Sequence, residues 1–521
     1  MTTSTQPGPA DGPKPVSPTA PARTAAAPAA GELAHSWRLK NAAGLTVFVP
    51  DRLNSITAYV MLEQERWFEH EIDFVHRLVG PDSNVLDIGA NHGVYSLALA
   101  SHLVGGRVWA FEPTSDPRAR LQASVNANDF QHKITVMPIG LSDSRREVEF
   151  SISANSELNS RHATSAVHET VLLDTLDAFA VAHLEGRPIG FVKLDAEGEE
   201  PQVLTGGSQF FTQQSPVVMF ELQHGGQVNL PLIDRFRAFG FDVFHHLPEL
   251  DLLVPFKPDS GAQHFMLNLF AVKPGRQATL AVEGLLVREA DLAASSPGTT
   301  PDDAAMAAWE ARMGAAGGTG LTSLAADAPF RRAFDDVITA HFSPSASAAE
   351  RFARLTRARD GLRAHLQSGQ QVSREELLLL VHALNACGDQ MTAVTHARHL
   401  LEHWPDFYQP TLPVMPPSAR DAGRTHVAAI GSWIRHGLEE FIETHRHYSS
   451  YYAACDLPLM IRLLAHPDHG AEIERRYALH MLRNGQAPDV ALVPELLTPV
   501  RSVNGTLLGR LIAEVAAAKP A

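Results

Sequence analysis

Two blocks of acids and glycines have the residue types that hold an adenosine. Residues 84–93 read Asn-Val-Leu-Asp-Ile-Gly-Ala-Asn-His-Gly, and residues 108–112 read Val-Trp-Ala-Phe-Glu. Each apolar run predicts a buried strand, so the glycine turn and Glu112 stand where two strands end. Backbone amides at such a turn approach the ligand, and the acid accepts hydrogen bonds from ribose hydroxyls. We therefore expect an adenosine-bearing ligand, held at its ribose by Glu112.

The glycine spacing narrows the identity of that ligand. A dinucleotide site has the pattern G-x-G-x-x-G, whereas this chain has Asp87-x-Gly89-x-x-x-Gly93. We expect Gly89, Asn91 and Gly93 to pass the backbone around the ligand, and Asp87 to face a cationic ammonium group. S-adenosyl-L-methionine has such a group, so the loop favours this cofactor. The alternative is an ordinary strand–turn–helix in which the glycines only allow the tight turn and no ligand binds.

A second acidic block offers a proton acceptor. Residues 191–194 predict a buried strand, and Asp195-Ala196-Glu197-Gly198-Glu199-Glu200 follows it. A hydroxyl is a poor nucleophile until a carboxylate or histidine within about 3 Å removes its proton. Asp195 or Glu197 is therefore the candidate catalytic base. The competing interpretation is that these acids stabilise the N-terminus of the following helix.

His224 is a third catalytic candidate, three residues after Glu221, where another predicted strand ends. Its imidazole is an alternative base or a substrate contact, unless it is an ordinary loop histidine. A divalent metal on Asp195, Glu197 and Glu221 is a further alternative, because hard cations take carboxylate oxygens. Our prediction for the site contains no metal. We expect His92 to line the cofactor loop without reacting.

Alternating strand and helix patterns must position these residues. Apolar runs alternate with helical periodicity over residues 85–138, which is typical of a parallel sheet covered by helices. Ligands bind at the carboxyl ends of such strands, so Gly89, Glu112, Asp195 and Glu221 are expected to meet there. Before the sheet, one helix is predicted over residues 63–79, from the spacing of Trp67, Phe68, Ile72, Val75 and Leu78.

Three blocks together resemble the FkbM family of methyltransferases: residues 85–93, residues 111–113 and residues 193–200. The resemblance covers roughly residues 40–273. It implies an α/β fold with a Rossmann-like seven-stranded sheet, in which the last strand is antiparallel. It also implies S-adenosyl-L-methionine as cofactor and O-methylation of a hydroxyl, often on a sugar or polyketide. Gly140-Leu141-Ser142-Asp143 resembles the family too, and Asp143 is a candidate contact near the adenine.

Composition divides the chain further. Residues 1–35 are rich in Pro and Ala and are predicted to be a disordered tail, because they cannot bury enough apolar surface. Residues 36–275 are the predicted methyltransferase domain. Residues 276–325 are rich in Ala, Gly, Ser and Thr and are predicted to be a flexible linker with one short helix at 302–313. Residues 326–521 show helical patterns only and predict a separate all-α accessory domain.

Within the helical region, residues 375–386 and 391–403 predict a helix pair around Gly388 that resembles a tetratricopeptide hairpin. No second copy stands at the repeat period, so a helical bundle and a solenoid both remain open. One helical face carries His396, His399 and His403. These histidines are either metal ligands or part of a solvated surface. An aromatic–basic cluster is formed by His445, His447, Tyr448, Tyr451 and Tyr452. The alternatives for this cluster are contact with a sugar, contact with a partner, or packing on a helix surface.

Charge and cysteine content set outer limits on function. The 521 residues have a formal net charge of −15, which argues against a general nucleic-acid binder. The two cysteines form neither a metal-spaced pair nor a disulfide framework. No apolar run approaches the roughly 18 residues of a membrane span, and the N-terminus does not resemble a secretory signal. We therefore expect a cytoplasmic protein.

These observations predict a methyltransferase that acts on a hydroxyl of a saccharide, another glycan or a secondary metabolite. The helical region is expected to bind the acceptor or a protein partner. Two other classes remain: a NAD-dependent Rossmann oxidoreductase, which shares the loop and acid, and a non-catalytic scaffold whose helical region mediates interactions. The glycine spacing and the block at residues 195–200 count against the oxidoreductase.

Overall fold

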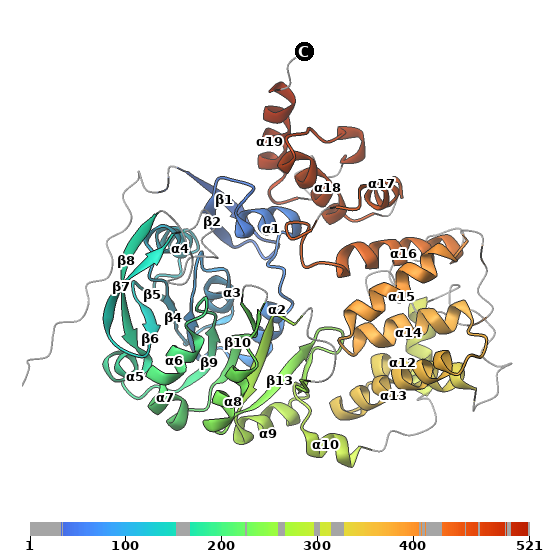
Figure 1. Cartoon of the computed structure of the whole chain (residues 1–521), viewed down its shortest axis with the longest axis horizontal. Coiled ribbons are helices and arrows are strands. Elements are labelled where there is room, and N and C mark those ends of the chain that lie inside the picture. The colour runs from blue at the N-terminus through green and yellow to red at the C-terminus, as the bar shows by residue number, and fades with distance from the viewer. Residues whose placement is uncertain are drawn as a thin grey trace, which may run out of the picture.

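The structure is a computed structural model, and two packed regions make up most of it (Figure 1). It describes residues 33, 35–152, 167–224, 227–258, 266–295, 303–313, 328–405, 408, 412, 430–453, 455–466, 469–494, 496 and 502–518. The tail predicted at residues 1–35 therefore lies almost wholly outside the described residues. Among the helices that are described, none has the length and apolar character needed to span a bilayer.

The central element is one mixed sheet of eight strands. Its spatial order is β14 (Leu252–Pro255), β13 (Asp242–Leu247), β15 (Asn268–Val272), β10 (Val217–Glu221), β9 (Ile189–Leu194), β3 (Asn84–Ile88), β4 (Val108–Phe111) and β5 (Ile134–Met137). The five strands from β10 to β5 are parallel, and β15 is antiparallel to both of its neighbours. The antiparallel last strand is thus confirmed. The expected count of seven strands is wrong, because β14 adds an antiparallel edge strand to β13.

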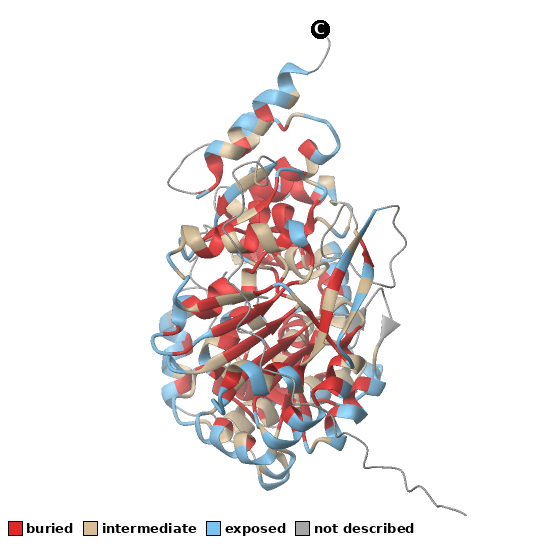
Figure 2. Ribbon diagram, turned by 90° about the vertical axis from the view of Figure 1, so that its left-hand side faces the viewer, coloured by how far each residue is buried: buried red, intermediate tan, exposed pale blue. Residues whose placement is uncertain are grey.

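The parallel strands are buried on both faces, which explains their near-continuous apolar sequences. Val85 and Val108 point to one hydrophobic cluster, while Leu86 and Trp109 point to another on the opposite face. Figure 2 shows the buried strands running through the middle of the molecule. The polar exceptions within or at the end of these strands, Asp87 and Lys193 among them, are therefore the informative residues.

Helices cover both faces of the sheet. The helices of this region are α1 (Ile56–Gln64), α2 (Glu71–Leu78), α3 (Val94–His102), α4 (Ser115–Ala127), α5 (Leu176–Phe179), α6 (Glu200–Gly206), α7 (Ser208–Gln213) and α8 (Pro231–Ala238), with a π-helical turn at Ala180–Leu184. Smaller sheets are formed by β1 (Ser36–Lys40) with β2 (Thr46–Pro50), by β6 (Gly140–Ser142), β8 (His168–Thr175) and β7 (Arg146–Ser151), and by β11 (Gln223–His224) with β12 (Gln227–Val228).

The single helix predicted over residues 63–79 is wrong. The chain forms α1 and α2 with a break between them, because Glu65 adopts a left-handed conformation with φ of 55° and ends α1. Trp67 and Phe68 therefore lie in a connecting segment and not on a helix. This segment places both rings beside the sheet edge where the acids lie.

The helical region follows the sheet. Its helices are α9 (Pro274–Val282), α10 (Glu289–Ala294), α11 (Asp303–Met313), α12 (Pro329–Phe342), α13 (Ala348–Gln367), α14 (Arg374–Ala386), α15 (Gln390–Glu402), α16 (Ile430–His445), α17 (Leu457–Ala465), α18 (Ala471–Arg483) and α19 (Gly505–Ala517), with a 3₁₀ turn at Val490–Leu492. The predicted pair around Gly388 is α14 and α15, and Gly388 has φ of 82°. A capping box at Ser373 and Glu376 begins α14.

The segment predicted as a linker, residues 276–325, contains most of α9 and all of α10 and α11. Leu285, Leu286 and Val287 between α9 and α10 are buried, and Leu286 bridges Leu253 of β14. The described part of this segment is thus built into the fold at the edge of the sheet. The domain boundaries themselves remain predictions.

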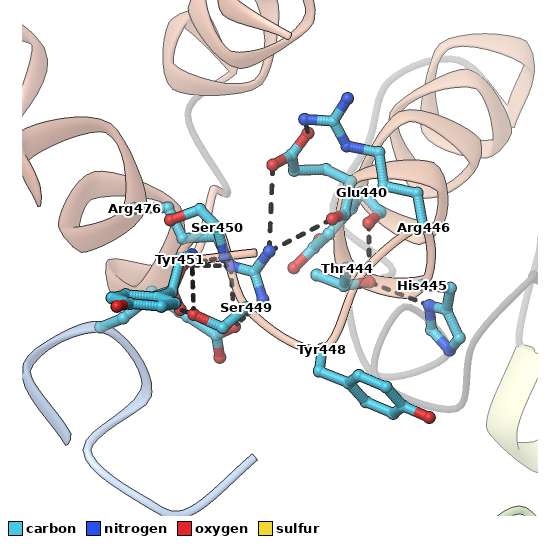
Figure 3. Close-up of polar contacts among 12 residues, drawn as sticks. Glu440, Thr444, His445, Arg446, Tyr448, Ser449, Ser450, Tyr451 and Arg476 are labelled. Carbon is cyan, nitrogen blue, oxygen red and sulfur yellow. Dashed lines mark hydrogen bonds and ion pairs between the residues drawn. The ribbon is translucent and has the colours of Figure 1, made fainter. Parts of the chain in front are cut away.

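Helix α1 joins the two regions. All nine of its residues are buried, and Arg475 of α18 donates to the Glu63 carbonyl oxygen at 2.7 Å. The Arg476 guanidinium lies 3.5 Å from the Glu63 carboxylate and 3.8 Å from that of Glu443. Figure 3 shows Arg476 at the centre of these polar contacts. One hydrophobic cluster runs through both regions around this contact.

Replacing Arg476 with alanine is expected to lower the free energy of unfolding by about 3–5 kcal/mol, because buried carboxylates then lose their cation. The matched control is Arg510→Ala, since Arg510 pairs with Glu514 on an exposed helix surface and such pairs contribute about 0–1 kcal/mol. Urea unfolding of the full chain measures both values. Equal losses in the two variants would show that the buried contact does not hold the regions together.

Candidate active site

The loop at residues 89–93, which we predicted to bind the cofactor, turns sharply after β3 and packs closely on its neighbours. Gly89, Asn91 and Gly93 have φ of 83°, 47° and 84°. A Cβ atom on Gly89 would lie 1.7 Å from the Asp195 carbonyl oxygen, and one on Gly93 would lie 2.2 Å from a Leu121 methyl group. The two glycines therefore allow the loop to pack against β9 and α4. This packing brings Asp195 directly against the cofactor loop.

Glu112 closes the loop from the neighbouring strand. Its Oε2 accepts a hydrogen bond from the Asn91 amide at 3.0 Å, and its Oε1 accepts from the Thr114 amide at 2.8 Å and from the Thr114 hydroxyl. Burial raises the pKa of Glu112, while the hydrogen bonds from Thr114 and Asn91 oppose that rise. Each carboxylate oxygen has two lone pairs, so Glu112 retains acceptor capacity for a hydroxyl.

Asp87 is buried beneath the loop. Its Oδ2 accepts from the Ser96 hydroxyl at 2.5 Å, and its Oδ1 has no hydrogen-bond donor among the described residues. Burial raises the pKa of Asp87, and the nearby Lys193 and Ser96 oppose that rise. A buried carboxylate oxygen without a donor is unusual, which suits a site that receives a donor from a ligand.

A buried cation stands among three carboxyl groups of the site. The Lys193 ammonium donates to Asp195 Oδ2 at 2.7 Å and lies 5.1 Å from the centre of the Tyr95 ring. Burial by itself lowers the pKa of Lys193, but Asp195, Asp87 and Glu69 together raise it above the usual lysine range. These three carboxyl groups therefore favour the charged form of Lys193. Lys193 fixes the position of Asp195.

Two of the carboxylates predicted at the strand ends, Asp195 and Glu221, do meet. One carboxylate oxygen each from Asp195, Glu200 and Glu221 lie within 4.8 Å of one another. Burial raises the pKa of Glu221 well above its usual value, and the charges of Asp195, Glu197 and Glu200 raise it further. Glu221 was absent from the predicted catalytic residues. Its position as the last residue of β10, next to the strand that Asp195 follows, was the available signal.

Glu200, the first residue of α6, bonds to the turn that precedes the helix. Its Oε1 accepts from the amides of Ala196 and Gly198 at 2.8 and 3.2 Å. Glu199 is the residue before α6 and makes no capping hydrogen bond through its side chain; it accepts from the Ser142 hydroxyl at 3.0 Å instead. Glu197 has φ of 53°, which turns the chain sharply before Gly198. Asp195 is thus paired with Lys193, and Glu200 organises the turn.

The other predicted residues lie around this centre. His92 is buried in the loop, with its Nδ1 3.2 Å from the Thr57 hydroxyl of α1. Asp143 is exposed after β6 and accepts from Arg146 and from Ser144 at 2.5 and 3.1 Å. The hydrogen bond from Arg146 is the main cause of the lowered pKa of Asp143. His224 lies in β11, and its side chain is outside the described part of the structure.

Two groups of side chains have metal-ligand spacing among the described residues. One is Asp195, Glu200 and Glu221, so Glu200 replaces Glu197 of the predicted alternative. The other is His399, Glu402 and His403, in which all three residues are exposed on α15. Glu402 takes the place of His396 there. The predicted site without a metal remains a prediction.

The sheet region thus combines a glycine loop with carboxylates at the ends of its parallel strands. Residues 87–243 match the family described as the methyltransferase FkbM domain. The chain thus carries an FkbM-type methyltransferase domain, as the motif resemblance predicted. The match lies on the sheet region and extends over none of the helical region.

Individual relatives are more distant or match only a short segment. The chain is 34% identical over 122 residues to the AMB antimetabolite synthetase AmbE of Pseudomonas aeruginosa, which covers 18% of this chain and 6% of that protein. It is 18% identical to the crystallised FkbM methyltransferase of Methylobacillus flagellatus, over 37% of this chain and 44% of that one, with a TM-score of 0.27. An O-methyltransferase from Bacillus cereus in complex with SAH is 13% identical, over 42% and 82% of the two chains, with a TM-score of 0.23.

Replacing Gly89 with alanine is expected to destabilise the protein much more than the same change at Gly44. Both glycines have positive φ, which costs an alanine about 1–2 kcal/mol. Only Gly89 also meets a backbone oxygen, which adds about 1–3 kcal/mol. Thermal and urea unfolding measure the difference. Equal losses would contradict the close packing of the loop on Asp195.

Proposed function

We propose that this protein is an S-adenosyl-L-methionine-dependent methyltransferase that methylates a hydroxyl group. The observation that carries the proposal is the junction of the loop at Gly89 with the Asp195 carbonyl. That junction places a cofactor-type loop against a cluster of carboxylates at the ends of adjacent strands. Donor binding and proton removal are thereby brought to one edge of the sheet.

The residues present fit the proposed cofactor. Asp87 has a buried oxygen with no donor among the described residues, which suits the ammonium group of a methionine moiety. Glu112 is anchored by loop amides and retains lone pairs for ribose hydroxyls. When bound, the cofactor supplies an electrophilic methyl group on a positively charged sulfur. The carboxylates around Lys193 outnumber that single cation, so the local charge favours a cationic ligand.

Proton removal from the acceptor is assigned to the carboxylates of β9 and β10. Asp195 is the base expected from the sequence, and its hydrogen bond from Lys193 fixes its orientation. Glu221 is the second candidate, because its raised pKa gives it a higher proton affinity. A base whose pKa approaches the working pH is the most effective one. We therefore assign the role of catalytic base to Glu221 and the positioning of the acceptor hydroxyl to Asp195. Glu197 and His224 are lesser candidates for the base.

The acceptor is a hydroxyl compound, small or part of a glycan, and the helical region is the proposed source of further acceptor or protein contacts. Asp143 remains a proposed contact near the adenine. The protein is proposed to act in the cytoplasm.

Glu112→Gln is expected to weaken S-adenosylhomocysteine binding about 10- to 100-fold, because hydrogen bonds to a charged group contribute about 1.5–3 kcal/mol. Glu169→Gln is the matched control, since Glu169 accepts from Ser115 on the exposed side of the same segment. Isothermal titration of the full chain measures both variants. A wild-type protein that binds NAD alone would indicate an oxidoreductase, and one that binds neither ligand would indicate a scaffold.

A pH test separates Glu221 from Asp195. The folded-state pKa of Glu221 is raised, so this carboxyl is protonated below that pKa and turnover falls as the pH drops through it. Because the pKa of Glu221 is higher in the folded state than in the unfolded state, the free energy of unfolding also falls as the pH rises from the unfolded-state pKa to the folded-state pKa. Asp195→Asn removes a neighbouring negative charge, so the acidic limb should move to lower pH while turnover falls.

Glu221→Gln should abolish the acidic limb and lower turnover by about 10²- to 10⁴-fold. Transfer of a labelled methyl group to a panel of hydroxyl compounds gives the pH profile, and a carboxyl NMR titration gives the pKa of Glu221 directly. Cofactor affinity should stay nearly unchanged in both variants. A fully active Glu221→Gln enzyme would return the role of base to Asp195.

A further inference from the structure

Aromatic side chains from both regions meet beside the carboxylates. We call Tyr448–Tyr452, which follows α16, the tyrosine segment. The Tyr448 and Tyr452 rings lie 5.5 and 5.9 Å from the Phe68 ring, centre to centre. Trp67 lies 4.7 Å from Phe68 on the same connecting segment. The helical region therefore contributes two of the four rings of this aromatic surface.

A short chain of contacts leads from the aromatic surface to the catalytic carboxylates. The Trp67 indole donates to Glu69 Oε1 at 3.0 Å, and Asn268 donates to Glu69 Oε2 at 2.8 Å. Asn268 is the direct partner of Glu221 across the strands β15 and β10. Leu267, the residue before Asn268, packs against the small hydrophobic cluster that contains Phe68. The rings thus lie at the edge of the sheet where Glu221 ends its strand.

The tyrosine segment is held in place by α1. The amide of Ser450 donates to the Glu63 carboxylate at 3.0 Å, and the Ser449 hydroxyl donates to the same group. The side-chain amide of Gln64 donates to the Tyr448 carbonyl oxygen at 2.6 Å. Figure 3 shows the Tyr448 ring pointing away from the Arg476 contacts that fix its neighbours. Its backbone is thus fixed while its ring is presented on the opposite side.

Resting on the proposed function, we infer that the tyrosine segment forms part of the acceptor site, and that the acceptor is a neutral sugar ring. Tyr452 is 49% exposed, so its ring has a face to offer, and Trp67 is half-buried beside it. Aromatic faces pack against the apolar C–H face of a sugar ring, while carboxylates accept hydrogen bonds from its hydroxyls. The nearby carboxylates Glu69, Asp195 and Glu221 disfavour an anionic acceptor.

The test measures sugar binding directly, on the full chain with S-adenosylhomocysteine bound. The probes are methyl α-glucoside, methyl α-mannoside and methyl α-rhamnoside, detected by saturation-transfer NMR of their ring protons. We expect at least one glycoside to bind. Tyr452→Ala and Tyr448→Ala should weaken its binding about fivefold or more, as loss of an aromatic contact does.

Tyr408→Ala is the matched control, because Tyr408 packs on Trp404 within the helical region and bonds to Glu375. It should bind the glycoside as the wild type does. Tyr452 is exposed, so its variant keeps the test valid if Tyr448→Ala fails to fold. Binding of no glycoside, or equal binding by all variants, would overturn the inference while cofactor binding persists. Loss of cofactor binding in the wild type would instead remove the proposed function itself.

Discussion

The site depends on one buried cation. Lys193 lies inside the sheet and is surrounded by Asp87, Asp195 and Glu69, which come from the cofactor strand, the catalytic strand and the connecting segment. An unpaired buried charge costs several kcal/mol, so these acids must stay close to the ammonium group for it to remain charged. The same attraction holds the donor loop, the proton acceptor and the aromatic surface in a fixed arrangement. A neutral residue at position 193 would leave several buried carboxyl groups without their shared partner.

Around that centre the proposed reaction draws on both regions of the molecule. The proposed donor side lies mainly on the sheet region, since Glu112 accepts from the Asn91 amide of the loop and the loop packs against Asp195 and α4. The acceptor side takes rings from both regions, because the tyrosine segment packs on Phe68. Helix α1 contacts both sides: Thr57 lies against His92 of the loop, and Glu63 binds the tyrosine segment. The helical region is therefore close to the proposed chemistry, in contrast to a remote appendage.

Local sequence signals predicted the donor side and failed on the acceptor side. The strand–glycine–helix order at residues 84–102 and the acids at strand ends follow from patterns within about 20 residues, and these elements are present. Periodicity could not reveal the left-handed Glu65, so Trp67 and Phe68 were assigned to a helix face. Glu221 was predicted at a strand end but not as a catalytic base, because its position beside Asp195 depends on the strand pairing of β9 with β10. The contact of Tyr448 with Phe68 spans most of the chain, and no local pattern encodes it.

The burial of α1 has a consequence for how the chain is made. Glu63 is synthesised early, yet its cationic partner Arg476 and the serines that bind it come about four hundred residues later; the separation is 412 positions for the contact with Arg475. Contacts of such separation form late and slow folding. While the chain emerges from the ribosome, Glu63 lacks the serines and the arginine that contact it in the finished fold. The packing of α1 is therefore completed only when nearly the whole polypeptide is available, and a ribosome that stalls within the helical region releases a chain in which Glu63 lacks these partners.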